Sequence, residues 1–120
     1  MRQITDGTSK TALVGEKSLL PRFYETGYGD PPPRSPHYSN NPGDNSSMYQ
    51  GHDLDNARII GGVPIQDSDD TATGYEKIFG SAHAGSMNLA LCDGSVQTIE
   101  YEIDQQVWGG YGARNDGQTP

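Results

Sequence analysis

One stretch near the C-terminal end constrains the fold more than any other: residues 79–103, which read FGSAHAGSMNLALCDGSVQTIEYEI. Apolar residues alternate with polar or small ones from Met87 to Cys92, Asp93-Gly94 follows, and a second β-prone run opens at Val96. An Asp-Gly pair between two such runs is typical of a type I′ turn, because both residues tolerate positive φ. The sequence therefore predicts a β-hairpin whose loop is Asp93-Gly94.

A two-residue loop fixes which side chains face one another across this hairpin. Leu91 would lie opposite Val96 and Leu89 opposite Thr98, which gives one apolar face near the turn. From Ile99 onwards the apolar residues, at every second position to 103, fall on the opposite face. Either a bulge shifts the register or both faces are partly covered. We favour partial covering by another element.

The rest of the chain allows only a small core. It has 120 residues, of which 32% are hydrophobic, together with 16 glycines and 8 prolines. A chain of this length forms one domain, and no window keeps an apolar i, i+3, i+4, i+7 pattern over the length of a core helix. We therefore predict a single domain over residues 1–120. Its fold class is α+β but mainly β, with a small antiparallel sheet of three or four strands and long loops.

A further strand is predicted near the N-terminal end. Residues 11–17 read TALVGEK and contain a short apolar run that suits a central strand next to the hairpin. Glu16, at the end of this run, is either solvated or points inward to a polar partner.

The segment after the hairpin is predicted to hold a short turn of helix. Asp104 is placed to cap one turn over residues 105–108, which Gly109 and Gly110 would stop. Trp108 is the only tryptophan, and we expect its indole to cover one end of the sheet. Residues 112–120 should form a mobile tail.

Residues 21–74 are predicted to be a long loop region rich in proline and glycine. Six of the 8 prolines lie between residues 21 and 42, and Tyr24, Tyr28 and Tyr38 punctuate the same stretch. A surface rich in proline and aromatic rings can bind a peptide or a sugar. The commoner explanation is that the rings hold a long loop against the sheet.

Two acidic clusters, near residues 51–56 and 67–70, raise the question of calcium, which takes closely spaced carboxylate oxygens. Neither cluster follows the EF-hand pattern. Solvated acidic turns are the simpler interpretation, since such residues dominate ordinary loops. If calcium binds, the candidate ligands are Asp53, Asp55, Asp67, Asp69, Asp70, Asp93 and Asp116.

Charge and cysteine content exclude several classes of partner. The net charge is −8, and the 8 basic residues are spread singly, so no stripe of cations can neutralise successive phosphates or anionic lipid. No apolar run approaches the length of a membrane-spanning helix. Cys92 is the only cysteine, so neither an internal disulfide nor a thiolate zinc site can form. The first residues carry no export signal, which taken alone indicates the cytoplasm.

The hairpin also carries a resemblance to a known family. His83, nine intervening residues and then Asp93-Gly94 form a pattern that closely resembles the signature of a large prepilin-like domain family of unknown function. The resemblance continues in residues 4–16, at Trp108 and in residues 114–117, while residues 21–74 match little. The family is abundant in planctomycetes and related bacteria, and its members are sometimes labelled as solute-binding proteins.

The resemblance implies a type II secretion pseudopilin-like architecture. Family members begin with a short basic leader and a long hydrophobic helix, which anchors the precursor and later packs into a filament. The resemblance implies that this chain starts where members already have their globular head under way, as a fragment, a truncated gene call or a divergent short form. We therefore expect a pilin-like head without its helix, with one sheet face exposed, marginal stability and a place in the periplasm or at the cell surface. By analogy with some secretion pseudopilins, calcium in the C-terminal loops is a possible cofactor.

Two functions remain open at this point. The first is a non-enzymatic structural subunit whose partners are other pilin-like subunits. The second is an extracellular module that binds carbohydrate, peptide or calcium through the Tyr-rich and acidic loops of residues 22–75. An enzyme is disfavoured, because Ser81 does not form a G-x-S-x-G elbow beside His83. We expect His83 to be structural, hydrogen bonded to the backbone or to Asp93, with a metal-binding role as the less favoured alternative.

Overall fold

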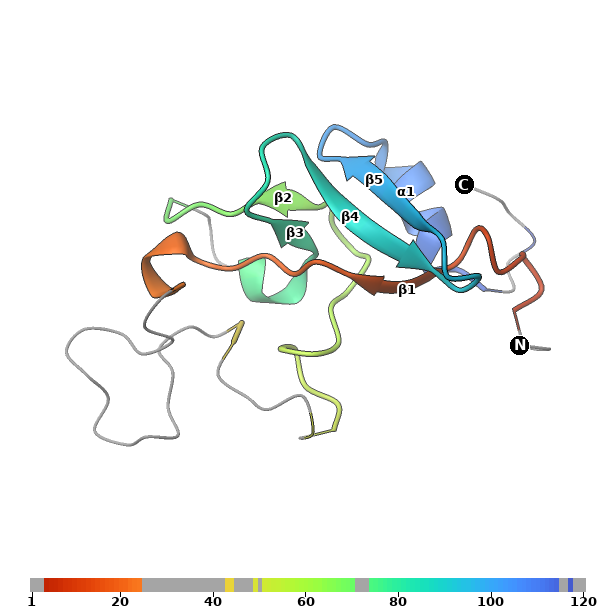
Figure 1. Ribbon diagram of the computed structural model, residues 1–120, viewed down its shortest axis with the longest axis horizontal. Helices are drawn as coiled ribbons and strands as arrows, with labels where there is room; N and C mark the ends of the chain where they lie inside the picture. The colour runs from red at the N-terminus through yellow and green to blue at the C-terminus, as the bar shows by residue number, and fades with distance from the viewer. Residues whose placement is uncertain are drawn as a thin grey trace.

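The predicted hairpin is the centre of the fold. The computed structural model describes residues 4–24, 43–44, 49, 51–70, 74–114 and 117. In it, β4 (Ser86–Leu91) and β5 (Val96–Glu100) pair as antiparallel neighbours. The strand β1 (Ala12–Gly15) pairs antiparallel with the other edge of β4, which gives the order β1-β4-β5 (Figure 1). The predicted small antiparallel sheet of three or four strands is confirmed, with three strands in the described part of the chain.

The loop of the hairpin differs from the prediction by one residue. Leu91 N donates to Ser95 O at 2.9 Å and Gly94 N donates to Leu91 O at 2.9 Å, so three residues separate the paired positions. Gly94 has φ +87°, whereas no described residue other than glycine has positive φ. A type I′ turn requires positive φ at Asp93 as well, so the two-residue loop was wrong. A three-residue loop with glycine in the left-handed position forms instead.

This extra residue settles the phase problem in the second strand. Ala90 lies opposite Val96 and Met87 lies opposite Ile99, so the apolar residues after 98 share a face with those of β4. Val96 consequently points outward and is 68% exposed. The favoured explanation, partial covering of both faces, was wrong, and no bulge interrupts the pairing from Ser86↔Glu100 to Ala90↔Val96; the longer loop shifts the register instead.

The strand β1 lies at an edge of the sheet. The sequence analysis predicted a central strand, which was wrong. After β1, Glu16 N still donates to Asn88 O at 3.3 Å, but Glu16 O accepts from Gly80 N at 3.1 Å. Ser18 N then donates to Ile78 O at 3.5 Å. The chain leaves β4 at Glu16 and continues beside residues 78–80. In the described part of the chain, β4 is therefore the only strand paired with β1.

Four short elements complete the first two thirds of the fold. The strands β2 (Ile65–Gln66) and β3 (Gly80–Ser81) form a small parallel pair, which the sequence did not predict. A Cβ at Gly80 would lie 2.2 Å from Ile65 O, so only glycine allows this approach. The 3-10 helices are η1 (Pro21–Phe23) and η2 (Tyr75–Lys77). The elements η1 and β2 thus interrupt the stretch predicted to be loop.

The helix α1 (Gln105–Gly112) begins as predicted but runs further. The Asp104 side chain accepts from Gln106 N and Val107 N, which confirms the cap. Helix-interior glycines cost about 1 kcal/mol each, and Gly109 and Gly110 were expected to stop the helix. They are instead inside it, because packed aromatic residues flank them on both sides. No helix of the described residues is long and apolar enough to cross a membrane.

The residues just after α1 are tied to the N-terminal segment. Ala113 O accepts from Thr11 Oγ1 at 3.3 Å, and Arg114 O accepts from Thr5 N at 2.8 Å. Gly117 N donates to Asp6 Oδ1 at 3.0 Å. Where the structure describes the stretch predicted to be a mobile tail, that stretch is hydrogen bonded.

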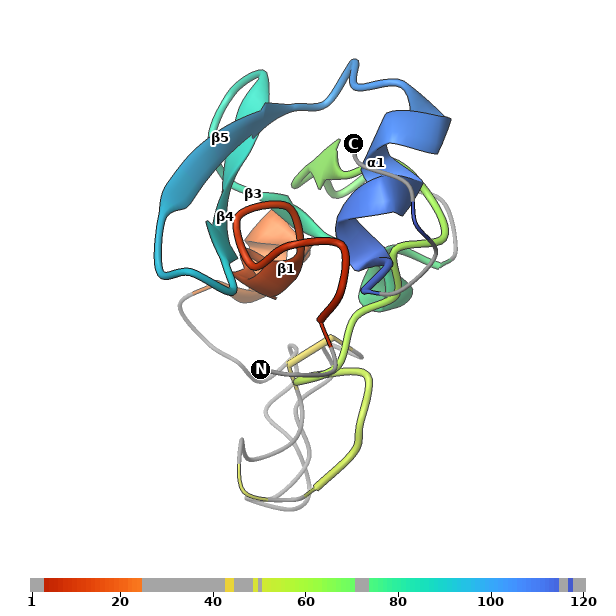
Figure 2. The same cartoon turned by 90° about the vertical axis from the view of Figure 1, so that its right-hand side faces the viewer.

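Trp108 lies within the core on one side of the sheet, the side that α1 covers (Figure 2). The indole is fully buried and packs in a cluster with four residues of the hairpin: Met87, Leu89, Leu91 and Ile99. The Phe79 ring meets it edge-on, with 5.7 Å between ring centroids. The indole Nε1 donates to Gly62 O at 2.8 Å. Trp108 therefore fills the core rather than closing one end of the sheet.

The opposite side of the sheet carries an exposed apolar row. Val14 lies opposite Ala90 in β4, and Ala90 lies opposite Val96 in β5. Val14 is 64% exposed and Val96 68% exposed, while Ala90 is half-buried. We call these three residues the apolar row. The expected exposed sheet face is therefore present.

The core predicts a large contrast between two identical substitutions. Leu89→Ala removes a side chain with 0% exposure, and such changes cost about 2–5 kcal/mol. Leu13→Ala removes a side chain that is 63% exposed, and we expect a cost of roughly 0.5 kcal/mol or less. Urea unfolding followed by tryptophan fluorescence measures both. Equal losses would mean that the core is not centred on β4.

Candidate functional site

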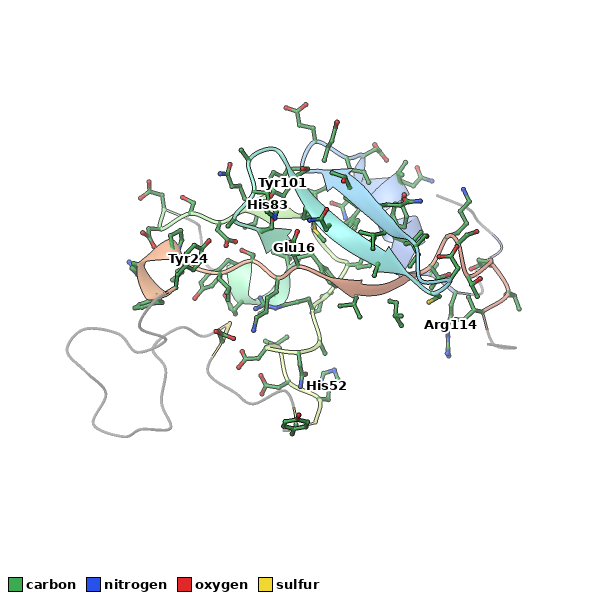
Figure 3. All side chains as sticks on the ribbon, viewed as in Figure 1. Glu16, Tyr24, His52, His83, Tyr101 and Arg114 are labelled. Atoms are coloured by element: carbon green, nitrogen blue, oxygen red, sulfur yellow. The ribbon has the colours of Figure 1, made fainter. Side chains whose placement is uncertain are left out.

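The signature histidine lies in a polar cluster at the open end of the hairpin. The cluster consists of Glu16, Ser81, His83 and Tyr101, which we call the His83 cluster; Figure 3 shows Glu16, His83 and Tyr101 close together. Its members come from the end of β1, from β3 and the loop after it, and from the end of β5. Four segments of the chain therefore meet at this point.

Tyr101 and Ser81 hold the loop between β3 and β4. The Tyr101 hydroxyl lies 2.8 Å from Ser81 Oγ and donates to His83 O at 2.8 Å. Ser81 Oγ accepts from His83 N at 3.1 Å and donates to Ser86 O at 3.0 Å. Ser81 is only 4% exposed. Its hydroxyl therefore serves the backbone of its own loop, which leaves it poorly placed to attack a substrate.

Glu16 joins the histidine to the sheet. Its Oε1 lies 3.3 Å from His83 Nε2, and its Oε2 accepts from Asn88 N at 2.6 Å. The carboxylate takes the position of a ladder acceptor because Glu16 O is already bound to Gly80 N. Glu16 is thus neither free in solvent nor turned inward to a buried partner: its half-buried side chain binds the exposed His83 and Asn88 N at the surface.

His83 and Asp93, the two ends of the sequence signature, do not meet. They lie beyond opposite ends of β4, whose 6 residues span roughly 20 Å at the usual strand rise. Asp93 Oδ1 instead accepts from Ser95 N at 2.9 Å and from Ser95 Oγ at 2.6 Å. Neither partner predicted for the His83 imidazole, backbone or Asp93, is the one that the described residues provide: its Nε2 lies 3.3 Å from Glu16 Oε1.

The acidic residues that were candidate calcium ligands serve separate local contacts. Asp67 Oδ1 accepts from Leu19 N at 2.9 Å, and its other oxygen accepts from the Tyr24 hydroxyl. Burial, together with the hydrogen bond to Asp67, raises the pKa of Tyr24. Asp69 Oδ1 accepts from Arg22 N at 3.1 Å. These two carboxylates thus hold the η1 segment, and Tyr24 helps to hold it, as the loop-pinning interpretation expects.

The structure does not bring the calcium candidates together. Asp53 Oδ1 accepts from Asp55 N at 3.0 Å inside one turn, and Ser68 Oγ accepts from Asp70 N at 3.2 Å inside another. Within residues 4–24, 43–44, 49, 51–70, 74–114 and 117, no three His, Cys, Asp or Glu side chains are grouped as a metal site requires. Asp116, Tyr28 and Tyr38 lie outside the described residues.

Two basic residues that the sequence did not single out organise the segment beside β1. Lys17 Nζ donates to Gly43 O at 2.9 Å and to Asp44 Oδ1 at 2.7 Å. Arg58 donates to the same carbonyl at 2.8 Å, and to Tyr75 O at 3.0 Å. Burial lowers the pKa of Arg58. Single cations far apart in the sequence carry no spacing signal, so only the folded chain reveals their convergence.

A groove runs along β1, whose edge away from β4 pairs with no other strand of the described residues. It consists of two adjoining cavities of about 290 and 340 Å³. Both are lined by Leu13, Gly15, Arg58 and Phe79, and the first also by Ile60. The walls therefore mix apolar and polar side chains: Arg58 lines both cavities, and Lys17, Asp55 and Asn56 line the second. An edge strand beside such a groove offers backbone groups and an apolar surface to an extended segment.

Comparison with known proteins gives one match. A family model described as "Protein of unknown function (DUF1559)" matches residues 1–106, which covers β1, the hairpin and the start of α1. No curated protein and no solved structure matches the chain.

The His83 cluster predicts different effects for two Tyr→Phe substitutions. Tyr101→Phe removes the hydroxyl on which Ser81 Oγ and His83 O converge, and we expect a loss of about 1 kcal/mol because these hydrogen bonds are lost. Tyr111→Phe removes a hydroxyl bound only to the exposed Gln97 Oε1, and we expect a loss near zero. Urea unfolding measures the loss, and hydrogen exchange of residues 82–86 locates it. Similar values for both variants would show that the cluster does not stabilise the loop.

Proposed function

The chain belongs to the DUF1559 family, whose function is unknown, and we propose that it is the globular head of a prepilin-like or pseudopilin-like subunit. In this role it is a structural component of a surface or secretion filament and carries out no chemistry. Its partners are other pilin-like subunits, and its place is the periplasm or the cell surface.

The observation that supports this proposal best is the apolar row. Val14, Ala90 and Val96 cross all three strands on the side of the sheet away from α1. The two valines are more than half exposed. A polar outer face is the usual arrangement for a sheet that faces water on one side. Apolar side chains aligned across neighbouring strands therefore suit a contact with another polypeptide.

The His83 cluster supports a non-enzymatic role. Its hydroxyl groups bind backbone atoms of residues 81–86, and its one imidazole faces a carboxylate that is itself bound to Asn88 N. A nucleophile would need a base in reach of its own hydroxyl proton, but the Ser81 proton is directed to Ser86 O. The most distinctive residues of the signature therefore act as supports for the sheet.

The proposal predicts that a charge in the apolar row weakens self-association. Val96→Asp should lower the association constant of the purified chain by roughly tenfold, because burying one valine side chain contributes about 1.5 kcal/mol. Val107→Asp is the matched control: this valine is 41% exposed and belongs to α1, on the other side of the sheet. Sedimentation velocity over a concentration series measures both variants.

A complementary measurement identifies the partner. A photoreactive amino acid at position 96 should cross-link to pilin-like subunits in cells that produce the protein, and one at position 107 should not. A monomer at all concentrations, together with cross-links to no pilin-like protein, would contradict the filament role.

A peptide-binding module is the second candidate, and the groove beside β1 favours it. One wall of the groove belongs to residues 55–60, inside the stretch 22–75 where a binding site was expected. Leu13, 63% exposed, borders it next to the unpaired strand edge. Among carbohydrate, peptide and calcium, an extended peptide has the most support, because the groove places apolar and polar side chains beside a strand edge.

The test of this candidate uses the neutral peptide acetyl-TVTVT-amide as probe. Binding should shift the backbone amide signals of Leu13 and Gly15 in a nuclear magnetic resonance titration, and Leu13→Lys should abolish the shifts. Shifts confined to residues of β5, or none at millimolar peptide, would remove this candidate and leave the filament role.

A further inference from the structure

The turn of the hairpin contains a peptide bond of a chemically vulnerable type. Asp93 precedes Gly94, and glycine has no side chain to hinder an approach to its backbone nitrogen. Gly94 N can attack the side-chain carboxyl carbon of Asp93, forming a C–N bond while the carboxyl group loses an oxygen as water. The product is a five-membered succinimide.

Hydrolysis of this ring completes an isomerisation. Water adds to one of the two carbonyl carbons, and the ring C–N bond at that carbon breaks. Opening at the former main-chain carbonyl routes the backbone through the Asp93 side chain, as an isoaspartyl linkage. One water leaves and one returns, so the mass does not change. The main chain gains one methylene group.

We propose that Asp93-Gly94 is a latent site of isoaspartate formation. The hydrogen bonds of these two residues to Ser95 and Leu91 keep the pair from reacting in the folded chain. Asp93 Oδ1 is held by Ser95 N at 2.9 Å and by Ser95 Oγ at 2.6 Å, which fixes the carboxylate over the residue after the glycine. Gly94 N, the attacking atom, donates to Leu91 O at 2.9 Å. Both reacting groups are thus engaged with other partners.

The charge state of the Asp93 carboxyl group also slows succinimide formation. The hydrogen bonds from Ser95 lower the pKa of Asp93, so the ionised form predominates more strongly at neutral pH. Loss of water proceeds from the protonated carboxyl group, whose oxygen leaves more readily. The same serine therefore restrains the geometry and reduces the reactive population.

Isomerisation would damage the fold at its most sensitive point. The three-residue loop sets the β4–β5 register, and one additional main-chain atom between Leu91 and Ser95 would disturb it. Ile99, which shares the core face with Met87, depends on that register. The proposal thus assigns Ser95 a protective role in addition to its part in the turn.

The experiment compares the folded chain with a synthetic peptide of residues 90–98 during incubation at neutral pH. Isoaspartate at each Asp-Gly pair is resolved by chromatography and mass spectrometry of proteolytic fragments. We expect Asp93 in the folded chain to isomerise at least about tenfold more slowly than in the peptide, since reaction requires local opening of the turn. Equal rates in the chain and the peptide would overturn the proposal.

The variant Ser95→Ala tests the role of the hydroxyl group, and Ser95→Thr, which keeps it, is the matched control. We expect isomerisation at Asp93 to rise roughly fivefold in Ser95→Ala, the factor for one ordinary hydrogen bond, and little in Ser95→Thr. Asp6-Gly7 in the same chain is the internal reference. A rise at Asp93 alone supports the proposal. An equal rise at both pairs indicates general destabilisation and overturns it, as does no rise.

Discussion

The register set by the loop at Gly94 is the constraint on which the rest of the structure depends. Because three residues separate Leu91 from Ser95, Ile99 joins Met87 and Leu89 on one face, and that face becomes the core. A two-residue loop would have divided these residues between the two sides of the sheet. The buried position of Trp108, the course of α1 and the outward direction of Val96 all follow from this register.

Local sequence signals predicted those parts of the fold that local chemistry determines. The hairpin follows from alternation and from a glycine that accepts positive φ, and the start of α1 follows from the Asp104 cap. The length of α1 did not follow, because Gly109 and Gly110 are poor helix formers whose helical state depends on the packing of Trp108 and Tyr111. Similarly, the end of β1 coincides with a contact to a distant segment, since Glu16 O accepts from Gly80 N and the chain then leaves β4.

The sequence indicated some residues of the candidate site but not how they are arranged in space. The family resemblance drew attention to His83 and Asp93 together, yet β4 separates them, and each has a local partner instead. Tyr101 was known only as an apolar position of a strand, and nothing in its spacing indicated that its hydroxyl reaches the loop after β3. The convergence of Lys17 and Arg58 on Gly43 O likewise arises from contacts between distant segments, which patterns of neighbouring residues do not encode.

The pairing of β1 with β4 joins segments that are far apart in the sequence: Cys92 Sγ contacts Ala12 O across 80 residues, and Thr5 bonds Arg114 across 109. A loop of this length must close before the stabilising contacts form, and the conformational entropy lost on closure slows folding. During synthesis the first strand leaves the ribosome long before its neighbour exists. The sheet is therefore completed only after β4 and β5 have emerged, and until then β1 stays available to chaperones and to other unfinished chains.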